Sequence, residues 1–344
     1  MNTRTRVLAS VALIIGVVGF ATTSASAAEL VIATFGGSFA KDTKACHIAA
    51  FTKETGAKVI LTLGGSVKHA ATIRATKGSP EIDVAYMDIS IAKQVKAEGL
   101  LERIDFSQLK NYADVAKQAF DTDGTYVNFM TAATVIAYNP KVITTPPTSW
   151  NDIFDPKYSG KMALGDITGT SGLHFLLALN KLNGGDLNNL DSGFKALSEN
   201  KDKVLMYYTQ ADQIVSLFER GEVIIAPWYP DRIGSAADKG VPVAVAYPKE
   251  GAVGIQPTLS IPKGSANKKL AMKFIDVVLS QEGQACFAEK KYAGPVNTKV
   301  SLSDKVAKIV PFGESYENLW YPDTDVVAKE RPKWTKRWQR AIDQ

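Results

Sequence analysis

The sequence predicts an α/β protein that is large enough to contain two domains. Short β-rich runs, glycine turns and segments of helical spacing alternate repeatedly along the chain, as in folds with a mostly parallel sheet. The chain has 344 residues, which is more than one small core requires. Hydrophobic residues make up 45% and charged residues 22%, which is the balance of an ordinary soluble globular protein.

The alternation begins at 30–35, a β-rich run that ends at a glycine pair, after which Ser38 opens a helical segment that stops at Gly56. Strands are expected at 30–35, 58–63, 83–87, 131–138, 161–164, 204–208, 222–226, 241–247 and 259–262. Helices are expected at 38–51, 91–98, 172–182, 212–220, 268–279 and in much of the chain after 300. The loop 144–149 contains two prolines, which continue neither a helix nor a central strand, so it is a plausible boundary.

The first 28 residues have the composition of a secretory signal peptide. Arg4 and Arg6 precede an apolar run at 7–20, small residues follow it, and the segment contains no acidic residue. The alternative is a membrane anchor, but the run is shorter than the roughly 20 residues that span a bilayer. We expect cleavage after Ala27 or Ala28. With no cysteine near that site for a lipid anchor, the periplasm is the expected compartment.

Charge and metal-ligand spacing exclude several classes of function. Removal of residues 1–28 would lower the formal net charge from +5 to +3, which is too mild to indicate nucleic-acid binding. The three histidines are scattered without metal-ligand spacing, so no metal or cofactor is expected. Cys46 and Cys286 form no CxxC motif, and in an oxidising compartment they could form one bridge.

Seven phrases of the sequence coincide, in order, with one protein family. They are Thr34-Phe-Gly-Gly-Ser38, Glu98-Gly-Leu-Leu-Glu-Arg-Ile-Asp105, Ile136-Ala-Tyr-Asn139, Ser149-Trp-Asn-Asp-Ile-Phe-Asp-Pro-Lys-Tyr-Ser-Gly-Lys161, Phe218-Glu-Arg-Gly-Glu-Val-Ile-Ile-Ala226, Ile261-Pro-Lys-Gly-Ser265 and Gly294-Pro-Val-Asn297. Between about 30 and 300 the chain resembles the periplasmic solute-binding proteins of ABC importers that are related to the spermidine/putrescine receptors. That group includes receptors for 4-aminobutyrate and opines.

The resemblance implies a two-lobe periplasmic-binding-protein fold of type II, with the ligand cleft between the lobes. We expect lobe 1 to contain 29–139 and 253–344, and lobe 2 to contain 140–252. The two hinge crossings are expected near 138–147 and 251–258. The resemblance assigns both cysteines to helices of lobe 1, so we expect a disulfide between Cys46 and Cys286. Lobe closure by hinge motion would then present the loaded protein to a membrane permease.

Candidate ligand contacts lie at the carboxyl ends of strands and at the helix starts that follow them, because these positions face the crevice of an α/β sheet. In lobe 1 they follow the first three strands, and each hydroxyl or carboxylate could instead cap a helix. These candidates are Phe35, Gly37, Ser38, Gly65, Ser66 and Asp88. Among them, Asp88 could pair with a ligand amine.

In lobe 2 the candidates are small hydroxyl residues before a helix, which suit an anionic group, and aromatic residues at strand ends, which could form cleft walls. The alternatives are a capping turn and buried core aromatics. These candidates are Thr168, Thr170, Ser171, Tyr208, Trp228 and Tyr229. At least one of the three aromatic side chains should reach the ligand. Arg232 follows the second aromatic pair and could grip a carboxylate through two hydrogen bonds, or form a surface salt bridge.

The sequence departs from the polyamine receptors at 254–258, where no carboxylate stands just before the return segment that begins at Ile261. The acids available to a polyamine would be Asp88 together with Asp212 or Asp231. A small carboxylate-bearing amino compound, such as an amino acid, an ω-amino acid or an opine, therefore fits better than the alternative ligand, a polyamine.

Three further interpretations are weaker. A ferric-ion receptor has only Tyr207-Tyr208 in its favour. A secreted enzyme would need a nucleophile and a base, and the adjacent Cys46 and His47 do not face each other on a helix, so we expect no enzyme. Trp334 and Trp338 lie among basic residues, but their spacing predicts an amphipathic C-terminal helix packed on a lobe. We expect a monomer that binds a small molecule and a permease, and no nucleic acid.

Overall fold

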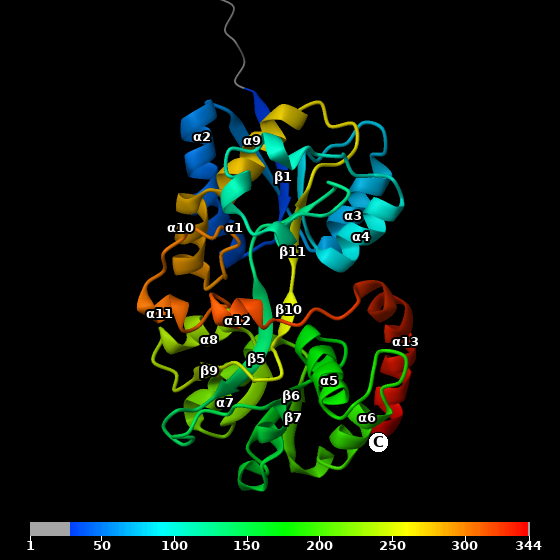
Figure 1. The fold of residues 1–344 in the computed structure, drawn as a ribbon, viewed down its shortest axis with the longest axis vertical. Helices are drawn as coiled ribbons and strands as arrows, with labels where there is room; N and C mark the ends of the chain where they lie inside the picture. The colour runs from blue at the N-terminus through cyan, green and yellow to red at the C-terminus, as the bar shows by residue number, and fades with distance from the viewer. Residues whose placement is uncertain (1–27, 343–344) are drawn as a thin grey trace, which may run out of the picture.

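The computed structural model describes residues 28–342, which form two lobes stacked along the long axis of the molecule (Figure 1). Each lobe has its own mixed β-sheet with helices around it, so the predicted two-lobe α/β fold is confirmed. The expected signal peptide lies outside the described residues except for Ala28. Within residues 28–342, no helix combines the length and the apolar character that crossing a membrane requires.

The first lobe contains a five-stranded sheet in the order β2-β1-β3-β11-β4. Its strands are β1 (Glu29–Thr34), β2 (Lys58–Leu63), β3 (Val84–Asp88), β4 (Val127–Asn128) and β11 (Pro257–Ser260). β1 pairs in parallel with β2 and β3, while β11 runs antiparallel to β3 and β4. Its helices are α1 (Ser38–Thr43), a π-helical turn (Lys44–Ile48), α2 (Ala49–Thr55), α3 (Ser66–Ala75), α4 (Ile89–Ala97), α9 (Lys268–Leu279) and α10 (Gln281–Lys291).

The second lobe contains a sheet in the order β10-β5-β8-β6-β7, with β9 paired to β5. Its strands are β5 (Ala132–Tyr138), β6 (Met162–Gly165), β7 (Val204–Tyr208), β8 (Ile225–Trp228), β9 (Ala244–Ala246) and β10 (Val253–Ile255). Its helices are α5 (Thr170–Leu182), α6 (Asp191–Ser198), α7 (Val215–Arg220) and α8 (Pro230–Ala237), and the chain continues through α11 (Asp304–Ala307), α12 (Glu314–Glu317) and α13 (Thr324–Ala341). Short 3-10 turns occupy Phe106–Gln108, Tyr112–Asp114, Lys117–Ala119, Trp150–Phe154, Pro156–Tyr158, Lys201–Lys203 and Ala211–Ile214.

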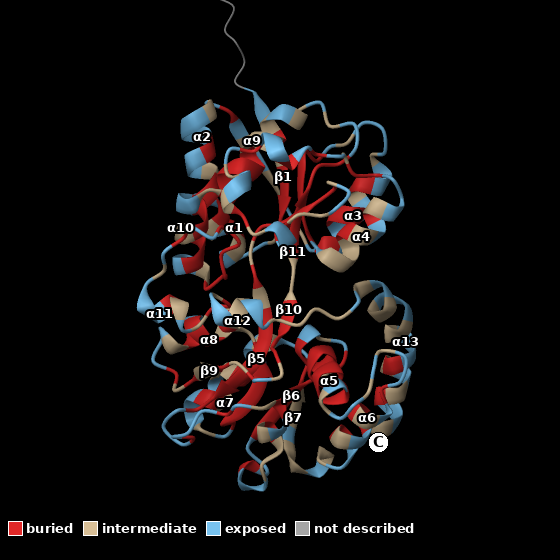
Figure 2. Ribbon diagram, in the orientation of Figure 1, coloured by how far each residue is buried: buried red, intermediate tan, exposed pale blue. Residues whose placement is uncertain are grey.

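Each lobe has a separate apolar core around its sheet (Figure 2). In lobe 1, Phe51, Phe129 and Phe274 are fully buried between the sheet and the helices on its flank. In lobe 2, α5 contributes an almost continuous apolar run from Leu173 to Leu179, because this helix is covered on nearly all sides. Two independent cores of this kind allow the lobes to move as rigid bodies.

The expected lobe boundaries differ from the structure in two places. The first crossing lies at 129–131, between β4 and β5, rather than at 138–147, because β5 already pairs with β8 and β9 of the second sheet. The Asn139-Pro140 pair ends a strand within lobe 2 and does not mark a crossing. The second crossing, at Gln256 between β10 and β11, falls inside the expected interval.

The C-terminal helix α13 packs on lobe 2, although residues 253–344 were expected in lobe 1 (Figure 1). Trp334 and Trp338 are only 4% and 1% exposed and join the core that contains Phe194 and Leu197 of α6. Their spacing of four residues puts both indoles on one helix face, so the predicted amphipathic helix is confirmed. Its docking on lobe 2 brings the chain back across the cleft after α10.

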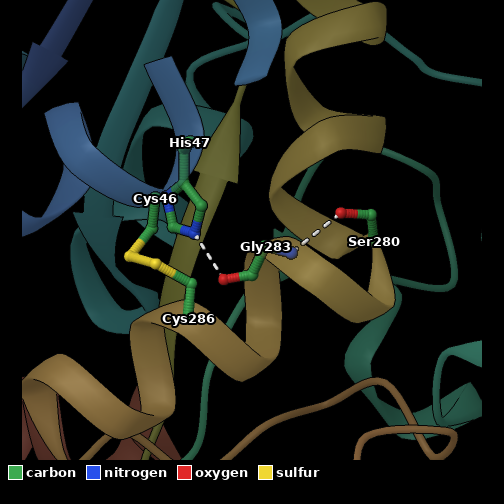
Figure 3. Close-up of a disulfide and its surroundings, with 5 residues drawn as sticks. All are labelled: Cys46, His47, Ser280, Gly283 and Cys286. Carbon is green, nitrogen blue, oxygen red and sulfur yellow. Dashed lines mark hydrogen bonds between the residues drawn. A yellow bond between two sulfur atoms is a disulfide. The ribbon is translucent and has the colours of Figure 1, made fainter. Parts of the chain in front are cut away.

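A disulfide joins Cys46 of the π-helical turn to Cys286 of α10, with their Cα atoms 5.5 Å apart (Figure 3). The neighbouring His47 is buried, stacks near Phe287 and reaches the carbonyl oxygen of Gly283 through Nε2 at 3.3 Å. Burial lowers the pKa of His47 to about 4, so its ring is neutral at physiological pH. The bridge therefore ties the first helices of lobe 1 to its last helix.

Candidate binding cleft

The cleft between the lobes holds a cavity of about 390 Å³. Lobe 1 contributes the start of α4, including Asp88, and lobe 2 contributes one face of α5. The hinge strand β10 with its extension to Gln256 also lines the cavity, as does Arg331 of α13. A second hollow of about 320 Å³ adjoins it, since both are lined by Thr170 and Ile255. Together they form a two-ended cleft.

Asp88 is the carboxylate of the first cavity. It ends β3 and precedes α4, and its backbone N–H donates to Oγ of Ser66 at 3.0 Å, while that hydroxyl lies 3.0 Å from its carboxylate. Asp88 is solvent-accessible, yet desolvation by the surrounding protein raises the pKa of its carboxyl, and the hydrogen bond from Ser66 opposes this rise. An ammonium group of a ligand would relieve that unfavourable desolvation.

Arg331 is the cation of the same cavity. One guanidinium nitrogen donates to the backbone carbonyls of Ile167 and Thr168, at 3.2 and 2.7 Å, which anchors the side chain beside the loop before α5. Burial lowers the pKa of Arg331, and no carboxylate of residues 28–342 forms an ion pair with it. A guanidinium remains charged even so, and it has further donors for a ligand. The cavity therefore contains a partly desolvated positive charge that has no carboxylate partner among the described residues.

The start of α5 meets the end of β6 at very short range. A Cβ atom on Gly172 would lie 2.3 Å from the carbonyl oxygen of Gly165, so only glycine permits this approach. The N–H of Ser171 in the first turn donates to the hydroxyl of Tyr229 at 2.8 Å. Desolvation raises the pKa of Tyr229, and the hydrogen bonds from this turn oppose the rise. Tyr229 thus already occupies one of the donors at this helix start.

His174 lies one turn along α5 from Thr170, on the same helix face, and lines the first cavity. Its Nδ1 is 2.9 Å from Oγ1 of Thr134 on β5. Desolvation and the positive charge of Arg331 lower the pKa of His174 to about 3, so the imidazole is neutral. The cavity therefore presents a neutral ring beside a charged guanidinium.

Charged groups from both lobes meet in the second hollow. Arg232 of α8 is 3.2 Å from a carboxylate oxygen of Asp212 and 3.7 Å from one of Asp231, and its side chain is 41% exposed. Across the cleft, Lys291 at the end of α10 lies 3.8 Å from Asp231 and donates to Oγ of Ser38 at 3.2 Å. Desolvation raises the pKa of Asp231, while the charges of Lys291 and Arg232 oppose the rise. In this hollow the cations already have acidic partners.

The structure brings several of the predicted residues together at the cleft. Asp88 lines the first cavity, Tyr229 and Arg232 line the second, and Thr170 lines both. Ser66 reaches the site through its hydrogen bond to Asp88, and Ser38 through Lys291. Thr168 supports the site indirectly, since its N–H donates to Asp166 and its carbonyl accepts from Arg331.

Three predicted residues are in the core and do not face the cleft. Tyr208 is 2% exposed, and its hydroxyl donates to the carbonyl of Pro227 and lies 2.9 Å from Oγ of Ser171, which is itself 1% exposed. Trp228 is fully buried, stacks on Phe218 and donates to the carbonyl of Ala211. For Tyr208 and Trp228, the core alternative considered for strand-end aromatics is the one the structure shows. Tyr229 is the one of the three aromatic candidates that lines the cleft.

Phe35, Gly37 and Gly65 lie at the predicted strand ends but do not line either cavity. Phe35 packs edge-on against Phe39, at 5.1 Å between ring centres. Gly37 has a φ of 64° and precedes α1, and Gly65 precedes α3. These glycines set the entry of the two helices, and a ligand contact from them stays a prediction.

Sequence reasoning missed Arg331, His174, Gln256 and Lys291, which line the cleft. Arg331 belongs to a helix that was assigned to the other lobe, and His174 was weighed only as a metal ligand. One signal was available: His174 stands four residues after Thr170, and residues at this spacing share a helix face.

The structure gives no support to the iron or enzyme interpretations. Within residues 28–342, no group of three or more His, Cys, Asp or Glu side chains is placed to hold a metal ion. Tyr207 packs edge-on against Trp338, 5.6 Å between ring centres, and Tyr208 is in the core. Cys46 is bonded to Cys286, so it presents no thiol nucleophile beside His47.

Comparison with known proteins gives a consistent result. The chain is 27% identical over 289 residues to the spermidine/putrescine-binding periplasmic protein of Escherichia coli K12, covering 80% of this chain and 79% of that one. An ABC transporter structure from Clostridium perfringens ATCC 13124 superimposes with a TM-score of 0.79 at 26% identity, covering 91% and 99% of the two chains. A GABA receptor structure does so with a TM-score of 0.75 at 26% identity, covering 90% and 96%.

Residues 47–312 match the sequence model of one protein family, the bacterial extracellular solute-binding proteins. This span includes both hinge crossings and most of both lobes. The relatives include a spermidine/putrescine-binding periplasmic protein, and the structural neighbours include an ABC transporter structure. The chain therefore belongs to the bacterial extracellular solute-binding protein family.

Proposed function

We propose that the protein captures a small compound that carries both an amine and a carboxylate, and delivers it to an ABC permease in the inner membrane. Within this proposal the protein is a periplasmic monomer. Residues 1–28 direct its export as a signal peptide and are then cleaved off. The protein performs no chemistry on its ligand. Nucleic acid is not a partner in this proposal.

The observation that carries the ligand class is the pairing of charges in one cavity. Asp88 is partly desolvated and would gain from an ammonium, while Arg331 is partly desolvated and has no carboxylate partner within residues 28–342. A zwitterionic ligand would satisfy both groups at once, since buried charges are normally paired. A cavity of about 390 Å³ is in the range of small-molecule sites.

The neighbours are consistent with this class. The GABA receptor is named for a ligand with an amine and a carboxylate, and this chain covers 96% of it. Arg232 was the sequence-based choice for the carboxylate, but its contacts with Asp212 and Asp231 lead us to assign that role to Arg331 instead.

The second candidate is a polyamine receptor. The Escherichia coli relative that matches 80% of this chain binds spermidine and putrescine by name. Asp231 and Asp212 near the second hollow could add to Asp88 as partners for a second ammonium. Against this candidate, Arg331 would repel a polycation, and Gln256 provides no charge at the hinge.

The experiment is a thermal-shift panel followed by calorimetry on the hits. The panel contains amino acids, ω-amino acids such as GABA, opines, putrescine and spermidine, applied to protein freed of co-purifying ligand. A ligand that binds only the native state stabilises it by about 2.7 kcal/mol at a hundredfold excess over Kd. We expect the largest shifts from compounds with both groups. The largest shift from putrescine or spermidine would establish the polyamine receptor instead.

A further inference from the structure

We infer that His174 is a specificity-determining residue that, beside Arg331, recognises the anionic end of the ligand through an uncharged hydrogen bond donated by Nε2. This inference rests on the proposed function, because it concerns the anion end of the same cavity. It assigns the second carboxylate oxygen to a ring that is held in place by Thr134.

The ring is fixed on one side and open on the other. Nδ1 of His174 lies 2.9 Å from the hydroxyl of Thr134, so that nitrogen is occupied. The ring also lines the cavity that contains Arg331 and Asp88. Two other histidine nitrogens, Nδ1 of His47 and Nε2 of His69, are buried without a partner, and Nε2 of His174 is not among such atoms. The Nε2 edge is therefore the one available to a ligand.

The inference assigns the imidazole proton to Nε2. In that tautomer Thr134 donates its hydroxyl hydrogen to Nδ1, which lies 2.9 Å away, and Nε2 carries the hydrogen that can be donated to a ligand. The charged and titratable groups that share this cavity are Arg331 from α13, Asp88 before α4 and Tyr321 before α13. Desolvation by burial, and then the positive charge of Arg331, lower the pKa of His174, so the ring stays neutral.

Two different donors suit a carboxylate better than two cations would. Arg331 supplies the positive charge, and the neutral imidazole supplies a hydrogen bond of fixed direction. Because the ring is neutral, the ligand-free protein does not bear the cost of desolvating a second charge. An amide ligand would keep one acceptor for His174 but lose the ionic interaction with Arg331. The pair therefore makes the site selective for an anion over a neutral group of similar shape.

The test measures selectivity by calorimetry, with GABA and its neutral amide, 4-aminobutanamide, as probes. We compare His174→Leu, His174→Gln, Thr134→Val and, as a control, His47→Leu, which makes the same exchange in the core of lobe 1. A hydrogen bond to a charged group corresponds to a loss of roughly tenfold to a hundredfold in affinity. We expect His174→Leu to lose this much for GABA and clearly less for the amide, so that the ratio of affinities falls.

The other variants separate recognition from packing. His174→Gln keeps a neutral donor and should recover most of the affinity for GABA. Thr134→Val should lower the ratio in the same direction but by less, because it removes the group that fixes the tautomer. His47→Leu should change the melting temperature without changing the ratio. A His174→Leu protein that keeps the wild-type ratio would overturn the inference, as would a ratio that falls equally in His47→Leu.

The two proposals fail in different ways. Wild-type protein that does not prefer GABA to its amide would overturn the anion site, and with it both proposals. If wild-type protein prefers GABA, and Arg331→Ala removes that preference while His174→Leu keeps it, only the inference on His174 is wrong.

Discussion

Replacement of Arg331 by alanine is the sharpest test of the cleft. Among residues 28–342, Arg331 has no acidic partner, and its burial already lowers the pKa of the guanidinium. A ligand carboxylate would therefore form a pair that closure removes from water. Removal of one member of such a pair costs about 3–5 kcal/mol, because the other charge is left uncompensated. Each 1.4 kcal/mol is a factor of ten, so affinity should fall by several hundredfold or more.

Arg232→Ala is the matched control. Both arginines line the cleft, but of the two only Arg232 forms ion pairs with acidic residues in the described part of the chain. Asp212 lies 3.2 Å from Arg232, whose side chain is 41% exposed, so its loss should change affinity by less than about threefold. Arg331→Lys should recover affinity only partly, since an ammonium does not reproduce the planar fork.

Calorimetry with the best zwitterionic ligand of the panel measures all three variants. Melting temperatures without ligand are needed as well, because Arg331 also binds the carbonyls of Ile167 and Thr168. The reasoning is refuted if Arg331→Ala loses less than threefold while Arg232→Ala loses several hundredfold. In that case the carboxylate binds in the second hollow, as the sequence alone had indicated.

Three more predictions concern the cleft and its frame. Desolvation raises the pKa of Asp88, so its carboxylate is protonated at a higher pH than an ordinary aspartate. Affinity for an amine ligand should therefore begin to fall at that higher pH when the pH is lowered. In calorimetry, Asp88→Asn should abolish this pH dependence. Loss of the Cys46–Cys286 bridge, which closes a sequence separation of 240 residues, should lower the unfolding free energy by roughly 2–5 kcal/mol; a denaturant midpoint unchanged by the double serine variant would count against this. Gly234→Ala should lower the melting temperature by several degrees, since its Cβ would lie 2.4 Å from the Tyr292 ring, and an unchanged value would mean that the two lobes separate freely there.

Much of the fold was predictable because local patterns determine individual elements. The strands 58–63 and 204–208 and the helix 268–279 have the predicted bounds. The first crossing was not predictable, because it is a short extended link at 129–131 with no glycine or proline to mark it. The turn at Asn139-Pro140 gave the stronger local signal for a crossing between the lobes. Turns also occur within a lobe, however, and this one ends β5 of lobe 2.

The site was predictable only where it follows strand ends. Asp88 and Thr170 were found by this rule, whereas Tyr208 was misplaced, because side chains of a strand alternate between two faces. Tyr207 packs toward Trp338 and Tyr208 toward the core of the other face. Arg331 was out of reach, since it stands far from the α5 start in sequence and meets it only through the docking of α13.

The disulfide has a consequence for the order in which the chain can mature. Cys46 belongs to the first helices of lobe 1 and Cys286 to its last one, so every strand of lobe 2 lies between them. Because the chain is made from its N-terminus, Cys46 is present before any strand of lobe 2, and Cys286 is added only after all of them. The sequence has only two cysteines, so no wrong intramolecular bridge can form in the interval. Until Cys286 is present, the thiol of Cys46 can form a disulfide only with another molecule. The intramolecular bridge therefore forms only after the second half of lobe 1 is present.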